Sequence, residues 1–338
     1  MGFFRSMWWS SPPSPPSPPP QTPSLTFSAN DDGTNICTLP GDYSYLIGEP
    51  VLAAARGGEK LLQSYSVGSA CGPAGLTESI FNPVTVVHWN PSTDLDTIID
   101  SFTKDQEFNK EFLRVFVFLI DDEQSFKPES IQKLLAGSTC QFFFVTSERI
   151  PQGPYFVRDA ILYQSWRLFP DIYEAFQLPT THGHGQDEFR GVTIMKDGVL
   201  MVPIPSRLHF PKTPDKPLNG LRVTVKDIIH LKGVRTTGQS RSYAKLYRPR
   251  ENTASIVTRL VEQGAMIIGK TKCTQFASSD QPTADWVDYH CPWNPRGDGY
   301  LSPRGSSTGT CVALAGYEWC DLGIGTDSKR DKWLTHES

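Results

Sequence analysis

The sequence has no long hydrophobic run and no secretory signal. Its longest continuous apolar stretch is VFVFLI, residues 115–120, far shorter than the roughly 20 residues that cross a bilayer as a helix. The first 20 residues contain no apolar core followed by a small-residue cleavage site, so they are not typical of a signal peptide. The sequence therefore predicts a cytoplasmic protein without a membrane span.

Paired cysteine motifs and a strong net charge are also lacking. The seven cysteines are an odd number, scattered and without a C-x-x-C pair, which is typical of reduced thiols. Lys and Arg total 32 against 36 Asp and Glu, a formal net charge of −4. That balance offers no electrostatic footprint for nucleic acid, so no nucleic-acid partner is expected.

The 338 residues are enough for two ordinary domains. Residues 1–40 are predicted to form a disordered leader, because eight of the 28 prolines lie in residues 10–23, interleaved with serine, and such a segment has nothing to pack. An N-terminal domain is expected over residues 41–212. It ends at the proline-rich connector FPKTPDKP, residues 210–217.

Strands dominate the expected N-terminal domain. Runs of β-branched and aromatic residues bounded by turn residues predict strands: VTVVHW (84–89), RVFVFLI (114–120), QFFFVT (141–146), PYFVRDAILY (154–163) and GVLMVPIPSRL (198–208). The segment KPESIQKLLAG, 127–137, predicts a helix that Gly137 ends. His182-Gly183-His184 lacks a cysteine or acidic partner at zinc-like spacing, so it is interpreted as a solvated loop. We predict a mixed α+β domain with no functional site.

The pattern changes in the second expected domain, residues 213–328. LRVTV (221–225) and AMIIG (265–269) predict buried strands on either side of an amphipathic helix over residues 251–264. Asn252 or Thr253 is the expected helix start and Gly264 the end. A strand, a helix and a second strand are typical of a helix-covered α/β sheet.

A loop of small residues, NPRGDGYLSPRGSSTGT (294–310), comes before a helix-like stretch at 311–316 and a strand at 321–327. Such loops can cradle an anion with free backbone N–H groups. However, the loop glycines Gly305 and Gly309 do not fit the phosphate-loop pattern, because Thr310 and Cys311 stand where that pattern has a lysine and a serine or threonine. The dinucleotide pattern G-x-G-x-x-G is also absent from the loop. No nucleotide or other cofactor and no metal is expected.

Five motifs follow one another in the second expected domain: PLNGLRVTVKD (217–227), GAMIIGKTK (264–272), NPRGDGY (294–300), GSSTGT (305–310) and GIGTD (323–327). In this order they resemble the amidase signature family. Residues around DWVDYH (285–290) are similar to a fungal subgroup in which a separate N-terminal domain comes first. The resemblance implies an N-terminal mixed α+β domain followed by the first part of an amidase-signature α/β domain, a mixed sheet covered by helices.

The family resemblance implies hydrolysis of a carboxamide C–N bond of a small-molecule amide by a Ser, cis-Ser, Lys triad. By motif, Lys226 matches the general base, Ser306 matches the bridging serine with a cis peptide bond, and Ser307 is assigned to substrate binding. A lysine acts as a base only when burial lowers its pKa, and the apolar strand before Lys226 favours that desolvation. Taken alone, Lys226 would be interpreted as a surface lysine at a strand end.

The resemblance breaks at the expected nucleophile. In the family, T-D is followed by one residue and then G-G-S, whose serine attacks the carbonyl carbon. Here Thr326-Asp327-Ser328 is followed by Lys329 and Arg330, and Asp331 holds the serine position. Residues 329–338 are predicted to be an unrelated tail after a truncated domain. We expect impaired amidase activity; the alternative is a catalytically dead fragment or pseudoenzyme, with a binding role or from a mis-predicted gene model.

Overall fold

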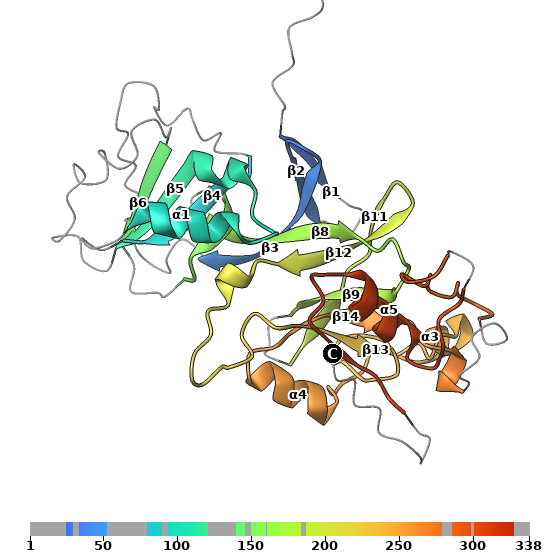
Figure 1. Ribbon diagram of the computed structural model, residues 1–338. Coiled ribbons are helices and arrows are strands. Elements are labelled where there is room, and N and C mark those ends of the chain that lie inside the picture. The colour runs from blue at the N-terminus through green and yellow to red at the C-terminus, as the bar shows by residue number, and fades with distance from the viewer. Residues whose placement is uncertain are drawn as a thin grey trace, which may run out of the picture.

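The computed structural model describes residues 25–29, 34–52, 80–89, 94–120, 140–145, 150–159, 161–183, 187–278, 286–298 and 301–327. Within these ranges the chain forms two β-sheets and a smaller number of helices (Figure 1). The predicted mixed α/β fold class is confirmed. No helix in these ranges is long and apolar enough to cross a membrane.

The first sheet has ten strands in the order β1-β2-β3-β8-β7-β4-β5-β6, with β12 beside β8 and β11 beside β12. β4, β5 and β6 pair in parallel and the other neighbours are antiparallel. The strands are β1 Thr26–Ala29, β2 Asn35–Leu39, β3 Tyr43–Leu52, β4 Asn82–His88, β5 Val115–Ile120, β6 Cys140–Val145, β7 Gly153–Arg158, β8 Ile161–Pro170, β11 Ile194–Lys196 and β12 Val199–Pro205. All five runs predicted as strands lie in this sheet.

One helix and two short 3₁₀ helices accompany the first sheet: α1 Leu95–Thr103, η2 Lys110–Arg114 and η4 Arg207–His209. The Asp94 side chain caps α1 by accepting a hydrogen bond from the Thr97 backbone N–H. Leu95 and Phe102 are buried in an aromatic core with Phe112 and Phe116. This core fixes the segment after α1, residues 104–109, against the sheet.

Two sequence-based predictions for this region are wrong in part. The leader predicted over residues 1–40 extends too far, because residues 26–29 and 35–39 are strands; the second pairs with β3, and its Ile36, Cys37 and Leu39 are buried. The run 154–163 is a hairpin and not one strand, since the chain reverses near Asp159, whose φ is +48°. Residues 1–24 and the helix predicted at 127–137 lie outside the described residues.

The second sheet has five strands in the order β10-β9-β14-β13-β15. β13 is central and pairs in parallel with β14 and β15, while β9 pairs antiparallel with β14. The strands are β9 Phe176–His182, β10 Phe189–Gly191, β13 Arg222–Lys226, β14 Met266–Thr271 and β15 Leu322–Ile324. The helices are α3 Arg241–Leu246, α4 Ser255–Glu262, η5 Gln275–Ala277 and α5 Thr308–Gly316. The predicted strands at 221–225 and 265–269 are confirmed, as are the helices within 251–264 and 311–316, whereas the strand predicted at 321–327 is shorter, Leu322–Ile324.

Helices α4 and α5 cover opposite faces of the second sheet (Figure 1). Ile267 packs with Val257 of α4, whereas the next residue, Ile268, packs with Val312 and Ala313 of α5. Successive side chains of a strand point to opposite faces, so a strand covered on both sides buries its side chains on both faces. Every residue of β13 is buried for this reason.

Helix α4 begins later than the sequence predicts. Its N-cap is Ala254, which makes no side-chain cap hydrogen bond. The hydroxyl of Thr253, an expected cap, accepts from the Lys232 backbone N–H and donates to the Asp187 carbonyl. Thr253 therefore connects neighbouring loops instead of starting the helix.

The two sheets share a core at the expected domain boundary. Val202 and Ile204 of β12 pack in one cluster with Phe176 of β9 and Ile268 of β14. The expected boundary at residues 212–213 falls in the connector between β12 and β13, while β9 and β10, which come earlier in the chain, pair in the second sheet.

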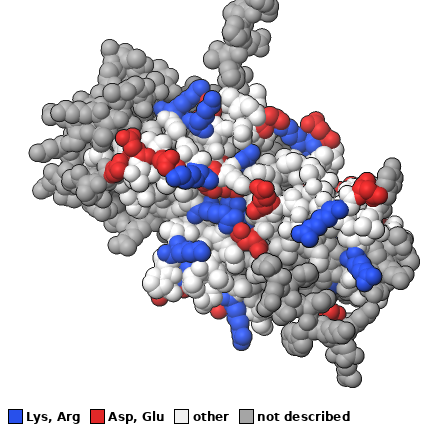
Figure 2. Space-filling view, viewed as in Figure 1, with Lys and Arg blue, Asp and Glu red and all other residues white. Residues whose placement is uncertain are grey.

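On the face seen in Figure 2, Lys and Arg side chains are interspersed with Asp and Glu.

Gly309, in the first turn of α5, offers a test of this packing. A Cβ at this position would lie 2.3 Å from the Ala175 carbonyl oxygen and 2.6 Å from the Lys272 backbone nitrogen. Since both contacts are backbone atoms that cannot turn away, Gly309→Ala is expected to lower the free energy of unfolding by about 1–3 kcal/mol in urea titrations. The exposed Cys311→Ala, on the same helix, is the matched control. Equal stability of the two variants would contradict this close approach.

Candidate functional site

The site is built where β13 ends. Lys226 is the last residue of this central strand, and its side chain is fully buried. Its Nζ donates to Ser306 Oγ at 2.6 Å and to Thr326 Oγ1 at 2.8 Å. The structure thus brings together Lys226 and Ser306, which are 80 positions apart in the chain, in hydrogen-bond contact.

Ser306 reaches Lys226 from the loop that leads into α5. The peptide bond between Gly305 and Ser306 is cis. The Ser306 carbonyl accepts from the Thr274 backbone N–H at 3.2 Å, and the Gly309 N–H donates to the Lys272 carbonyl at 2.8 Å. The segment after β14 therefore fixes both the serine and the start of α5.

Ser307, assigned by sequence to substrate binding, makes a reciprocal pair of bonds with Thr326. Its Oγ donates to the Thr326 carbonyl at 3.2 Å and accepts from the Thr326 N–H at 3.1 Å. Gly325 permits this approach, because a Cβ there would lie 2.8 Å from Ser307 Oγ. Ser307 thus ties the serine loop to the segment after β15, and its contact with substrate stays a prediction.

Thr326 is a site residue that sequence reasoning did not single out. Its hydroxyl accepts the second hydrogen bond of Lys226. The only signal was its place in the GIGTD motif, which identified the strand and not the role of the side chain. Both hydrogen bonds to the Lys226 amine therefore involve neutral hydroxyl groups.

The surroundings of Lys226 favour its neutral form. Burial holds the pKa of the Lys226 amine below the ordinary lysine value, although Cys273, Cys311 and Asp327 act in the opposite direction. Burial also raises the pKa of the Cys273 thiol to about 12, so this thiol stays protonated at neutral pH. A buried amine with a lowered pKa, next to a hydroxyl, can accept a proton.

A buried ion pair lies directly beside the site. Asp227 accepts from the N–H and hydroxyl of Thr237 and, at 2.6 Å, from the N–H of Gly238. Its carboxylate lies 3.6 Å from Lys270 Nζ, and both side chains are fully buried. Burial lowers the pKa of Lys270 to about 8, while Asp227 opposes this shift. Asp227 and Lys270 thus form their own ion pair, which fixes the 235–238 segment next to the end of β13.

The other sequence candidates lie away from this site or outside the described residues. His182 ends β9 and packs beside Phe189, with ring centroids 5.3 Å apart, and burial lowers its pKa to about 4; the solvated-loop interpretation is wrong for this residue. No group of three or more His, Cys, Asp or Glu in the described ranges is arranged to hold a metal ion. Position 331 and the tail at 329–338 are not among the described residues.

A buried lysine at the end of a parallel strand, hydrogen-bonded to a serine in the loop before a helix, is chemically able to exchange a proton with that serine. Residues 204–328 match the family model described as Amidase. This part of the chain is therefore similar to proteins of the amidase signature family.

Two relatives of known identity each match about a third of the chain. A glutamyl-tRNA(Gln) amidotransferase subunit from Synechococcus sp. (strain CC9311) is 38% identical over 119 residues, 33% of this chain and 22% of that protein. Its counterpart from Salinispora arenicola (strain CNS-205) is 39% identical over 113 residues, again 33% and 22%. The crystal structure of the corresponding Thermotoga maritima protein is 28% identical and covers 28% of this chain and 20% of that one, with a TM-score of 0.26. The chain spans about a fifth of the length of these relatives.

Proposed function

We propose that this chain carries the Lys226–Ser306 part of an amidase-type site that cleaves the C–N bond of a small carboxamide. The observation that carries the proposal is the 2.6 Å hydrogen bond between Lys226 Nζ and Ser306 Oγ. It stands together with the full burial of the lysine and the family match over residues 204–328.

The proposed relay passes a proton along the hydrogen-bonded groups of the site. The neutral amine of Lys226 takes the proton of the Ser306 hydroxyl, and Ser306 takes the proton of the attacking group as that group bonds to the amide carbonyl carbon. The C–N bond then breaks and the leaving nitrogen takes the proton back through the same hydroxyl. Thr326 fixes the amine from its other side, so Lys226 keeps its direction during the transfer.

We propose further that turnover by this chain is impaired. The attacking serine of the family pattern is replaced by Asp331, and its two preceding glycines are replaced by Lys329 and Arg330. A carboxylate has no hydroxyl proton for Ser306 to remove, and long cations replace residues whose small size leaves backbone N–H groups accessible to an oxyanion.

The direct test is hydrolysis of a simple aryl amide by the full chain and by Ser306→Ala. We expect a slow rate that falls at least about 100-fold in the variant, the order of loss for one proton-transfer group. Ser278→Ala, on an exposed loop, is the matched control and should keep the rate. A rate that is the same in Ser306→Ala and the unmodified chain would contradict the proposed relay.

Asp331 favours a second candidate function, in which the chain binds an amide without hydrolysing it. This candidate predicts no serine-dependent hydrolysis and no serine labelled by a fluorophosphonate, together with measurable binding of the aryl amide by calorimetry. The sequence of the transcript across codons 326–332 separates it from an error in the gene model, since a frame that restores G-G-S would remove the basis for this candidate.

A further inference from the structure

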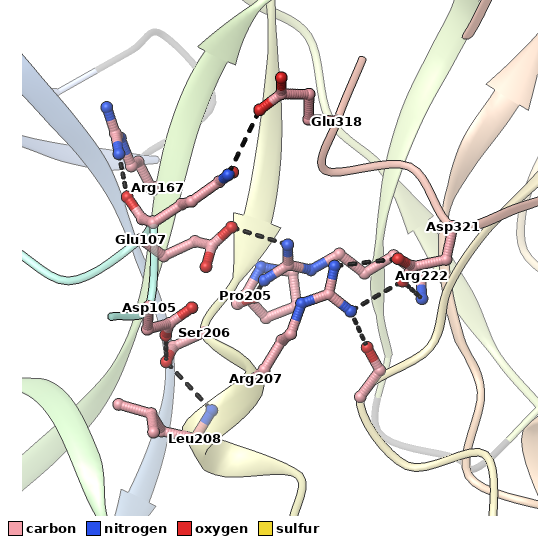
Figure 3. Close-up of polar contacts among 12 residues, drawn as sticks. Asp105, Glu107, Arg167, Pro205, Ser206, Arg207, Leu208, Arg222, Glu318 and Asp321 are labelled. Atoms are coloured by element: carbon pink, nitrogen blue, oxygen red, sulfur yellow. Dashed lines mark hydrogen bonds and ion pairs between the residues drawn. The ribbon is translucent and has the colours of Figure 1, made fainter. Parts of the chain in front are cut away.

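An arginine beside the first sheet binds the residue directly before β15 (Figure 3). Arg207 lies in η4, shortly after β12, and its Nη1 and Nη2 donate to both carboxylate oxygens of Asp321, at 2.8 and 3.0 Å. Nη1 also donates to the Gly220 carbonyl at 2.7 Å. Two parallel hydrogen bonds from one guanidinium fix the orientation of a carboxylate, so Asp321 is held in one place and in one direction.

Asp321 also holds the start of β13. Its Oδ2 accepts from the Arg222 backbone N–H at 2.8 Å, and its own N–H donates to the Arg222 carbonyl at 3.1 Å. The Arg222 side chain reaches towards the first sheet, where Nη2 donates to the Pro205 carbonyl at 2.7 Å and Nη1 lies 2.7 Å from Glu107 Oε1. Figure 3 shows Arg207 and Arg222 beside each other in this cluster. The starts of β13 and β15 are therefore joined to each other and to the first sheet.

Strand β15 leads from this cluster to the site. It has three residues and, among the described strands, pairs only with β13. Its residues are half-buried, whereas every residue of β13 is buried. Two positions after β15 ends, Thr326 accepts a hydrogen bond from Lys226 Nζ at 2.8 Å. A short edge strand has few contacts of its own, so its position depends on the groups that hold its ends.

Different parts of the chain hold the two ends of β15. At the end near the site, the Ser307 hydroxyl donates to the Thr326 carbonyl and accepts from the Thr326 N–H. At the other end, Arg207 holds Asp321. Asp321 and Thr326 are five positions apart, and the strand between them is extended. A shift of Asp321 along β13 is therefore passed on to Thr326.

We propose that Arg207 is a positioning residue for the site: by holding Asp321 it sets where β15 lies along β13, and so where Thr326 meets the Lys226 amine. Within the described ranges both hydrogen bonds of this amine go to residues outside the first sheet, so the effect of Arg207 passes through β15. The inference rests on the proposed function only in that Lys226 is taken as the base of the site.

An ion pair that only stabilises the fold predicts a different result. The Arg207 and Asp321 side chains are 40% and 24% exposed, and partly exposed ion pairs contribute little to stability. Loss of such a pair would make the whole chain easier to unfold, but the site of each folded molecule would stay as it was. A property of Lys226 in the folded chain therefore separates positioning from stabilisation.

The test measures the pKa of the Lys226 amine in the folded full chain by NMR of labelled lysine side chains, with Lys226→Met to assign the signal. In Arg207→Met, β15 should loosen and let water reach the amine. Water can accept the hydrogen bond that Thr326 accepts, whereas the burial that holds the pKa of this amine low is relaxed. We expect the affinity of the amine for a proton to rise about 10-fold, one pKa unit.

Arg114→Met is the matched control for the loss of a guanidinium. Arg114 also binds both carboxylate oxygens of a single partner, Glu111 of the same 3₁₀ helix, at 2.8 and 3.1 Å. Its replacement should leave the pKa of Lys226 unchanged.

A second variant, Asp321→Asn, tests the same contact if Arg207→Met folds poorly. It should also raise the pKa of Lys226, because an amide has only one oxygen to share between Arg207 and the Arg222 N–H. A Lys226 pKa that stays the same or falls in a folded variant would overturn the proposal, whatever happens to the stability of that variant. Amide hydrolysis is not measured, so this outcome is independent of the proposed function.

Discussion

Replacing Lys329, Arg330 and Asp331 together, as Lys329→Gly, Arg330→Gly and Asp331→Ser, is expected to raise covalent labelling by a fluorophosphonate about 10⁴-fold or more. The physical reason is that a nucleophile and its base act as a unit, and loss of the nucleophile alone costs several orders of magnitude in rate. Mass spectrometry of the labelled peptide should place the label at position 331.

The double variant Lys329→Gly with Arg330→Gly is the matched control, since it restores the small residues without the hydroxyl. It should stay at the level of the unmodified chain. If the triple variant also stays at that level, position 331 is not where the attacking group belongs, and the motif-based placement of the nucleophile is wrong. A label on Ser306 or Ser328 would lead to the same conclusion.

Lys226→Met in the triple variant is expected to lower labelling at least about 1,000-fold, because Ser306 then has no base to take its proton. The fold should persist. Methionine fills a similar volume and removes a buried amine that is costly to charge, so urea titrations should show a change in unfolding free energy of less than about 2 kcal/mol. Lys226→Arg should be equally inactive, since a guanidinium stays protonated.

The pH profile of labelling separates a base from a structural lysine. Lys226 acts only when neutral, so labelling by the triple variant should increase with pH, with an inflection below the ordinary lysine pKa because burial lowers the pKa of this amine. A structural lysine would leave the profile flat. Unchanged labelling in Lys226→Met, or a flat profile, would reject Lys226 as the base.

Local patterns were sufficient to predict most elements of the second sheet. The apolar runs of β13 and β14 and the helical period of α4 depend on neighbours within a few residues. The pairing of β9 with β14 does not, since Leu178 lies opposite Lys270, more than 90 positions away in the chain. The domain boundary, which was placed by composition at the proline-rich connector, therefore left the residues of β9 and β10 in the expected N-terminal domain.

The same limit explains which polar residues were missed. Arg222, Lys270 and Glu107 are charged, and charged residues are mostly exposed in proteins, so a sequence pattern gives no reason to bury them. Each is buried here because a partner far away in the chain compensates its charge: Glu107 for Arg222, and Asp227 for Lys270. Lys226 and Ser306 were found only because family motifs, and not spacing or periodicity, single them out.

The two hydroxyl partners of Lys226 determine how its hydrogen bonds can rearrange. A protonated amine can donate to Ser306 and Thr326 and still has one hydrogen left, whereas a neutral amine has two hydrogens and one lone pair. When Lys226 is neutral, its bond to Thr326 can keep its direction while the bond to Ser306 reverses. With Nζ only 2.6 Å from the serine oxygen and 2.8 Å from the threonine oxygen, this reversal needs only rotation of the serine hydroxyl hydrogen and of the amine hydrogens, and no heavy atom has to move. Thr326 is then the fixed end of a switch in hydrogen-bond polarity.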